Sequence, residues 1–114
     1  MQAISPSCIV LLGRAGMESN YVQLATETLR EELGAGLESD LECLYVLLVF
    51  TRGEQTTLRD VHDAWAIWRT QTNPQHKSCI RFEDLTLEVQ ELDQKYMQAI
   101  RDTSVRLSRG GYGY

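Results

Sequence analysis

The stretch from Thr57 to Asp93 limits the fold most, because it predicts a helix, a polar loop and a second helix in direct succession. It holds both tryptophans and both histidines of the 114-residue chain. Thr57 followed by Asp60 resembles a capping box, which starts a helix. Apolar side chains then recur at helical spacing until Asn73-Pro74, which ends helices. We therefore expect a helix over about residues 58–71.

Three further segments predict helices. Asn20 with Gln23 forms a second capping-box pattern, and Gly34 follows the segment 20–33 as a typical end signal. Residues 40–51 follow a cap at Ser39 or Asp40, and residues 87–108 follow a cap at Thr86. Glu27, Arg30, Glu31 and Glu32 are expected to face water. The predicted fold class is all-α, with four main helices in one small domain.

The segment 40–51 is apolar on almost every side of the expected helix. Such a helix is buried, or is shared with another subunit. We expect a central helix that also contributes to a subunit interface, so that the chain forms a homo-oligomer. A buried strand is the alternative interpretation, because β-branched and aromatic residues suit one. The candidate interface residues are Tyr45, Leu48 and, from the next helix, Trp68.

The two ends differ in composition from the helical domain, residues 17–109. Residues 1–16 contain Pro6, Gly13 and Gly16 and show no amphipathic period. Three interpretations stay open: a disordered or partner-docked arm, a start of translation at Met17, or a strand that pairs with another chain. Residues 110–114, Gly-Gly-Tyr-Gly-Tyr, are expected to be a flexible tail.

The net charge of −5 argues against a general nucleic-acid binder, because contacts with a phosphate backbone need a basic surface. The N-terminus lacks the basic start and long apolar segment of a secretory signal. No apolar run reaches the roughly 20 residues of a membrane span. We expect a cytoplasmic protein with neither nucleic acid nor membrane as a partner.

Catalytic and metal-binding patterns are weak. His76 and Cys79 have a spacing that suits two metal ligands, but zinc needs three or four and no second compact pair exists. Cys79 could pair with His62 or His76 as a nucleophile, yet nothing local activates its thiol. No glycine-rich loop follows a strand. The sequence therefore predicts no metal, no cofactor and no enzymatic activity.

One constellation could bind a ligand. His62, Trp65 and Arg69 share one side of the helix over residues 58–71, and His76 and Arg81 follow in the loop. An indole could stack on a base while a guanidinium binds phosphate. The alternative is structural: Trp65 lies in the core, His62 bonds to a backbone carbonyl, and Arg69 pairs with a surface acid.

The same segment resembles the RyR domain, the repeat unit named for ryanodine receptors and also found alone in bacterial and phage proteins. His62-Asp63-Ala64-Trp65-Ala66-Ile67-Trp68-Arg69 fits its pattern His-x-x-Trp-Ala-x-x-Arg, and residues 76–85 fit its second part. Asp93 matches an acidic position of its last helix. The sequence departs from the pattern at Lys77, where proline is usual, and at Val89-Gln90, where Glu-Lys is usual. Residues 17–107 are also similar to an uncharacterised family of small actinobacterial and actinophage proteins, which share the block at residues 60–68.

The RyR resemblance implies a non-catalytic module that binds an adenine nucleotide or an ADP-ribose-like signal. The ligand positions it carries over are His62, Trp65, Arg69 and His76, and Arg81 joins them from the constellation above. A phage-encoded protein of this kind would act in the host cytoplasm, where a host protein is a further possible partner. The alternative function is a structural or protein-interaction subunit without a small-molecule site.

Overall fold

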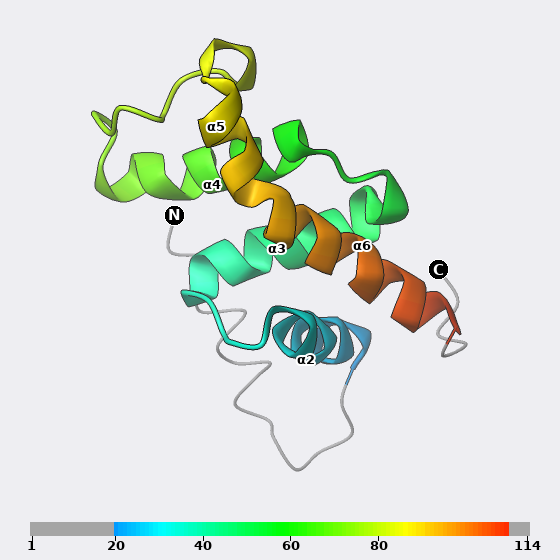
Figure 1. The fold of residues 1–114 in the computed structure, drawn as a ribbon. Coiled ribbons are helices and arrows are strands. Elements are labelled where there is room, and N and C mark those ends of the chain that lie inside the picture. Colours follow the sequence, from blue (N-terminus) through cyan, green and yellow to red (C-terminus); the bar gives the residue numbers. More distant parts are fainter. Residues whose placement is uncertain (1–19, 110–114) are drawn as a thin grey trace.

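Four main helices make up most of the described chain in the computed structural model, which describes residues 20–109. They are α2 (Tyr21–Leu33), α3 (Ser39–Thr51), α4 (Leu58–Thr72) and α6 (Gln94–Arg109) (Figure 1). Short helical turns lie between them: η1 (Gly53–Gln55), η2 (Phe82–Asp84), α5 (Leu87–Gln90) and η3 (Glu91–Asp93). The described chain contains no strand, which confirms the all-α class and makes the strand alternative for residues 40–51 wrong. The expectations for residues 1–16 and 110–114 fall outside the described residues.

Both predicted capping boxes are present. The Gln23 amide donates to Asn20 Oδ1 at 2.9 Å, and the Asn20 amide donates to Gln23 Oε1 at 3.0 Å. The Asp60 amide donates to Thr57 Oγ1 at 3.1 Å, and the Thr57 amide donates to Asp60 Oδ2 at 2.9 Å. Each pair satisfies two backbone N–H groups that a helix start would leave free. Gly34 ends α2 with a φ of 78°, as expected for a left-handed helix end.

The cap of α3 is Glu38, so the expectation of Ser39 or Asp40 is wrong. One carboxylate oxygen of Glu38 accepts the amides of Asp40 at 2.9 Å and Leu41 at 3.4 Å. The same oxygen accepts the indole N–H of Trp68 at 2.9 Å. A negative charge suits the positive end of a helix. Glu38 therefore starts α3 and also ties it to α4.

The predicted helix over residues 87–108 is interrupted by the tighter turn η3. The backbone of Gln90 and Glu91 stays in the right-handed helical region, so α5 leads on into α6 (Figure 1). A 3₁₀ turn has three residues per turn and changes which side chains share a face. Leu92, in this turn, is 69% exposed.

The core lies where α3 meets α2, α4 and α6. Its largest fully buried side chains include Leu29 from α2, Tyr45 and Val49 from α3, Val61 from α4 and Ile100 from α6. α6 packs on both α2 and α3, and α4 packs on α3. None of the helices over residues 20–109 has the length and apolar composition that would let it cross a membrane.

A partly buried ion pair joins α2 to α3. Arg30 Nε donates to Glu42 Oε2 at 2.9 Å, and Arg30 NH2 donates to Glu42 Oε1 at 2.7 Å. The Glu42 side chain is 4% exposed, whereas that of Arg30 is 40% exposed. Arg30, which was expected to face water, is thus partly exposed and also bonds to a carboxylate twelve residues away.

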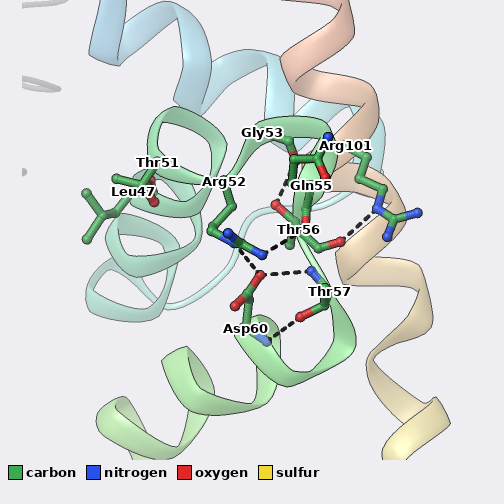
Figure 2. A network of polar contacts seen from close by, with 9 residues as sticks. All are labelled: Leu47, Thr51, Arg52, Gly53, Gln55, Thr56, Thr57, Asp60 and Arg101. Atoms are coloured by element: carbon green, nitrogen blue, oxygen red, sulfur yellow. Dashed lines mark hydrogen bonds and ion pairs between the residues drawn. The ribbon is translucent and has the colours of Figure 1, made fainter.

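Figure 2 shows the polar network at the corner between α3 and α4. Arg52 Nε donates to Asp60 Oδ2 at 2.8 Å, and Arg101 Nε, from α6, donates to the carbonyl of Thr56 at 2.8 Å. The corner needs Gly53, whose φ of +54° is unfavourable for other residues. A Cβ there would also lie 2.9 Å from Ser104 Oγ. This corner fixes where α4 starts and hence where its side chains point.

Candidate functional site

A hollow of about 210 Å³ lies between α4, the loop after it and the α5–η3 segment. Its lining residues are His62, Trp65, His76, Ser78, Val89, Leu92 and Asp93. Three of the five residues predicted to bind a ligand are therefore brought together there. The other two, Arg69 and Arg81, do not line it.

His62 is held from the loop side. It is 3% exposed, and its Nε2 lies 2.7 Å from the carbonyl oxygen of Ile80. A carbonyl only accepts, so Nε2 carries the proton and donates, and in the neutral ring Nδ1 is left as an acceptor. The structural interpretation of His62 is thus confirmed for one nitrogen. The other has no hydrogen-bond partner among the residues that the structure describes.

Trp65 lies between the two imidazoles. Its ring centroid is 5.8 Å from that of His62, with 27° between the planes, because residues three apart on a helix are neighbours. It also meets His76 edge-to-face, with 5.1 Å between the ring centroids. The Ser78 amide donates to His76 Nδ1 at 3.0 Å, so the neutral His76 ring carries its proton on Nε2. Trp65 also packs against the core, as the structural interpretation expects.

Asp93 completes the lining and was not among the predicted site residues. It is half-buried, and no hydrogen bond or ion pair reaches it from residues 20–109. Burial raises the pKa of its carboxyl, and the attraction of His62 acts in the opposite direction. Its charge also helps to raise the pKa of Tyr45, for which burial is the larger cause. Two sequence signals were available: the match of Asp93 to an acidic position in the RyR pattern, and its place four residues after Val89, on the same side of a helix.

The two predicted arginines lie elsewhere. The Arg69 guanidinium carbon is 4.6 Å from the ring centroid of Trp68, and its buried Nε has no hydrogen-bond partner in the described chain. The expected surface acid beside Arg69 is therefore replaced by a cation–π contact. The Arg81 side chain is 77% exposed and lies 3.9 Å from Glu83 and 3.8 Å from Asp84.

The residues predicted for an interface divide between core and surface. Tyr45 is 1% exposed and lies inside the core, so it has no free surface for a second chain. Leu48 and Trp68 are partly exposed. On α3, Leu47 is 54% exposed and presents more apolar surface than the predicted Tyr45.

A second hollow, of about 270 Å³, lies between α2 and α6 and is lined by Leu24, Glu27, Thr28, Glu31, Arg106 and Leu107. Several of its polar side chains are already hydrogen-bonded within the protein. Arg106 donates to Glu31 at 2.8 Å and to Glu32 at 3.0 Å, and Thr28 donates to the Leu24 carbonyl. The hollow at Trp65 is the better candidate, because it joins an indole and two imidazoles to Asp93, a half-buried carboxylate without a hydrogen-bond partner in residues 20–109. In the second hollow, Glu27 is exposed to water.

Metal and thiol chemistry find little support in this geometry. Over residues 20–109, no three His, Cys, Asp or Glu side chains are placed to hold a metal ion. The Cys79 sulfur lies 3.8 Å from the Thr70 hydroxyl and 4.0 Å from the Asn73 carbonyl oxygen. Within the described chain neither imidazole hydrogen-bonds to this thiol.

No curated protein and no solved structure matches the chain. A family model described as a domain of unknown function, DUF7701, matches residues 20–105, which span the helices from α2 through most of α6. The chain belongs to this family.

Proposed function

We propose that the protein is a non-catalytic cytoplasmic module that binds a small molecule in the hollow at Trp65. The ligand is a flat nitrogen-containing ring, such as the adenine of a nucleotide or of an ADP-ribose-like signal. The observation that carries the proposal is an indole flanked by two imidazoles beside a carboxylate with no partner in the described chain. Apolar walls with a few unpaired polar groups are typical of ligand sites.

The size of the hollow favours a single ring system. Pockets for drug-sized ligands have volumes of roughly 300–1,000 Å³. A hollow of about 210 Å³ is smaller than that range. We therefore place the base inside it and the remainder of a nucleotide outside.

The charged side chains near the hollow also favour an orientation with the base inside and the phosphate outside. A phosphate group needs arginine or lysine donors, but Arg69 lies on Trp68 and Arg81 faces two acids. The charged group in the lining is an acid, Asp93. This corrects the predicted role of the two arginines in the proposal, because they do not border the place assigned to the base.

Calorimetry tests the proposal with ADP-ribose, cyclic ADP-ribose isomers and ATP, together with two fragments, adenosine and ribose 5-phosphate. We expect at least one adenine compound to bind, adenosine to retain most of its affinity, and ribose 5-phosphate not to bind. The absence of heat with every compound at millimolar concentration would remove the proposal.

A matched pair of variants locates the binding. Val89 lines the hollow, whereas Leu87, two residues earlier on α5, is 74% exposed and does not. Val89→Trp should fill the hollow and abolish binding, and Leu87→Trp should leave the affinity unchanged. Equal affinities in both variants would place the ligand elsewhere.

A second candidate function is a protein-interaction subunit that self-associates or binds a host protein through α3. The observation that favours it is the 54% exposure of Leu47 on a helix that is apolar nearly all round. Light scattering on the full chain should then show an oligomer that Leu47→Lys dissociates. A wild-type monomer would exclude self-association, though not the ligand site.

A further inference from the structure

We infer that the hollow selects ligands whose ring carries a cationic or N–H-donating nitrogen, which bonds to the carboxylate of Asp93. This inference rests on the proposed function and names the chemical class of its ligand. It excludes rings with an anionic group at that position. Amino- or amidine-substituted aromatic rings are the class that fits.

The first reason is that Asp93 lacks the partners that two other carboxylates shielded from water have. Glu42 accepts two bonds from Arg30, and Asp60 accepts bonds from Arg52 and from the Thr57 amide. Asp93 is half-buried too, yet no donor reaches it within residues 20–109. Asp40 Oδ1 also lacks a hydrogen-bond partner within residues 20–109, but Asp40 does not line the hollow. An unpaired charge that is shielded from water costs stability. A donor from a bound ligand would remove this cost.

The second reason is the balance of donors and acceptors in the lining. An ionised carboxylate only accepts hydrogen bonds. Neutral His62 donates through Nε2 to Ile80, which leaves its Nδ1 as a further acceptor. His76 accepts from the Ser78 amide and retains one N–H donor on Nε2. A complementary ligand must therefore bring donors of its own.

The third reason is the position of the remaining charges. Arg59 bonds to Glu83 at 2.7 Å, and Lys95 lies over Tyr96, with 5.0 Å between its Nζ and the ring centroid. Neither residue lines the hollow. The aromatic face of Trp65 also attracts cations. Ring face and carboxylate thus favour the same kind of ligand.

The test compares benzamidine with benzoate, two ligands with the same ring and opposite charges. Trp68→Phe leaves Trp65 as the single tryptophan, so that its fluorescence reports binding at the hollow. In this background we expect benzamidine to bind at least tenfold more tightly than benzoate. Asp93→Asn should lower the affinity for benzamidine at least tenfold. Asp63→Asn, an exposed aspartate on α4 outside the lining, should change nothing.

The outcomes separate this inference from the proposed function. If benzoate binds as tightly as benzamidine, or if Asp93→Asn leaves the affinity for benzamidine unchanged, the inference that Asp93 selects the ligand is wrong. If adenosine then still changes the Trp65 fluorescence, the hollow remains the binding site. If none of benzamidine, benzoate and adenosine changes it, both the selection and the proposed site are wrong. Circular dichroism of each variant confirms that it is folded.

Discussion

At the scale of single residues, Asp93 works against the stability of the fold. Burial raises the pKa of its carboxyl, so protonation is favoured by folding. For an acid with a raised folded pKa, ionisation is costlier in the folded than in the unfolded protein. The penalty is full above the folded pKa and disappears as the pH falls below the unfolded value, about 4. Binding sites commonly retain such costs.

Asp93→Asn should therefore stabilise the protein at pH 7. The gain should shrink as the pH is lowered from 7 toward about 4, because the wild-type carboxyl becomes protonated over that range. Urea unfolding across this pH range measures the effect, with Asp63→Asn as the control. Destabilisation by Asp93→Asn at pH 7 would show that the carboxylate has a partner of its own.

Arg30 should behave in the opposite way. Its removal leaves Glu42 buried and unpaired, and breaking a fully buried ion pair costs about 3–5 kcal/mol. Because the Arg30 side chain is 40% exposed, solvent reduces that figure, and we expect Arg30→Met to cost about 2 kcal/mol. Urea unfolding at neutral pH measures it. Arg30→Met with Glu42→Gln should be more stable than Arg30→Met alone.

Gly53→Ala tests the corner between α3 and α4. A side chain at positive φ costs roughly 1–2 kcal/mol, and the contact with Ser104 Oγ adds to this. Ser104→Ala removes that oxygen. In the double variant, the loss of stability that comes from the contact should therefore disappear, and the loss that comes from the positive φ should remain. Thermal unfolding of the two single variants and the double variant measures both losses. Full additivity of the two substitutions would show that the added methyl group does not clash with the Ser104 side chain.

At the scale of helices, the starts and ends could be predicted where they depend on neighbours in sequence. Asn20 with Gln23, Thr57 with Asp60, and Gly34 each act within four residues, so the pattern itself contains the interaction. Glu38 was missed as a cap because glutamate is not among the short side chains that usually cap a helix start, although it accepts the same two amides that they do. The partner of Arg30 was missed because it comes from another helix.

The candidate site was predictable in part for the same reason. The spacing of His62 and Trp65 places them together on α4 whatever the rest of the chain does. Arg69 lies seven residues after His62, about 10 Å along the helix axis, and so lies beyond the hollow. Val89, Leu92 and Asp93 come from a second segment, whose turn η3 decides which of them face α4. Tertiary packing sets that turn, so helical spacing alone could not predict which of these side chains line the hollow.

Thr57→Ala tests the start of α4, the helix that carries most of the aromatic lining. Loss of a helix cap typically costs about 1 kcal/mol. Thr51→Ala is the control, because Thr51 Oγ1 donates to the carbonyl of Leu47 within α3 and has no other hydrogen bond in residues 20–109. Thermal unfolding should show a lower midpoint for Thr57→Ala and little change for Thr51→Ala. Equal midpoints would mean that the corner in Figure 2 holds α4 without its cap.

At the scale of the whole molecule, the core and the candidate site occupy different regions. α2 packs on α3 and α6, whereas the hollow lies between α4 and the α5–η3 segment. In Figure 1, α4 and α5 lie at the opposite end of the view from α2. Leu29, Val49 and Ile100 are fully buried in the core and do not line the hollow. Ligand binding at Trp65 should therefore leave α2 undisturbed.

Amide and indole NMR shifts during an adenosine titration test the central claim, that the hollow at Trp65 is a binding site. We expect the Trp65 indole signal and the amides of Ser78, Val89 and Asp93 to shift together and saturate. The amides of Thr28 and Arg106, beside the second hollow, should stay in place. Shifts confined to α2 and α6, or no saturable shift at Trp65, would contradict the account.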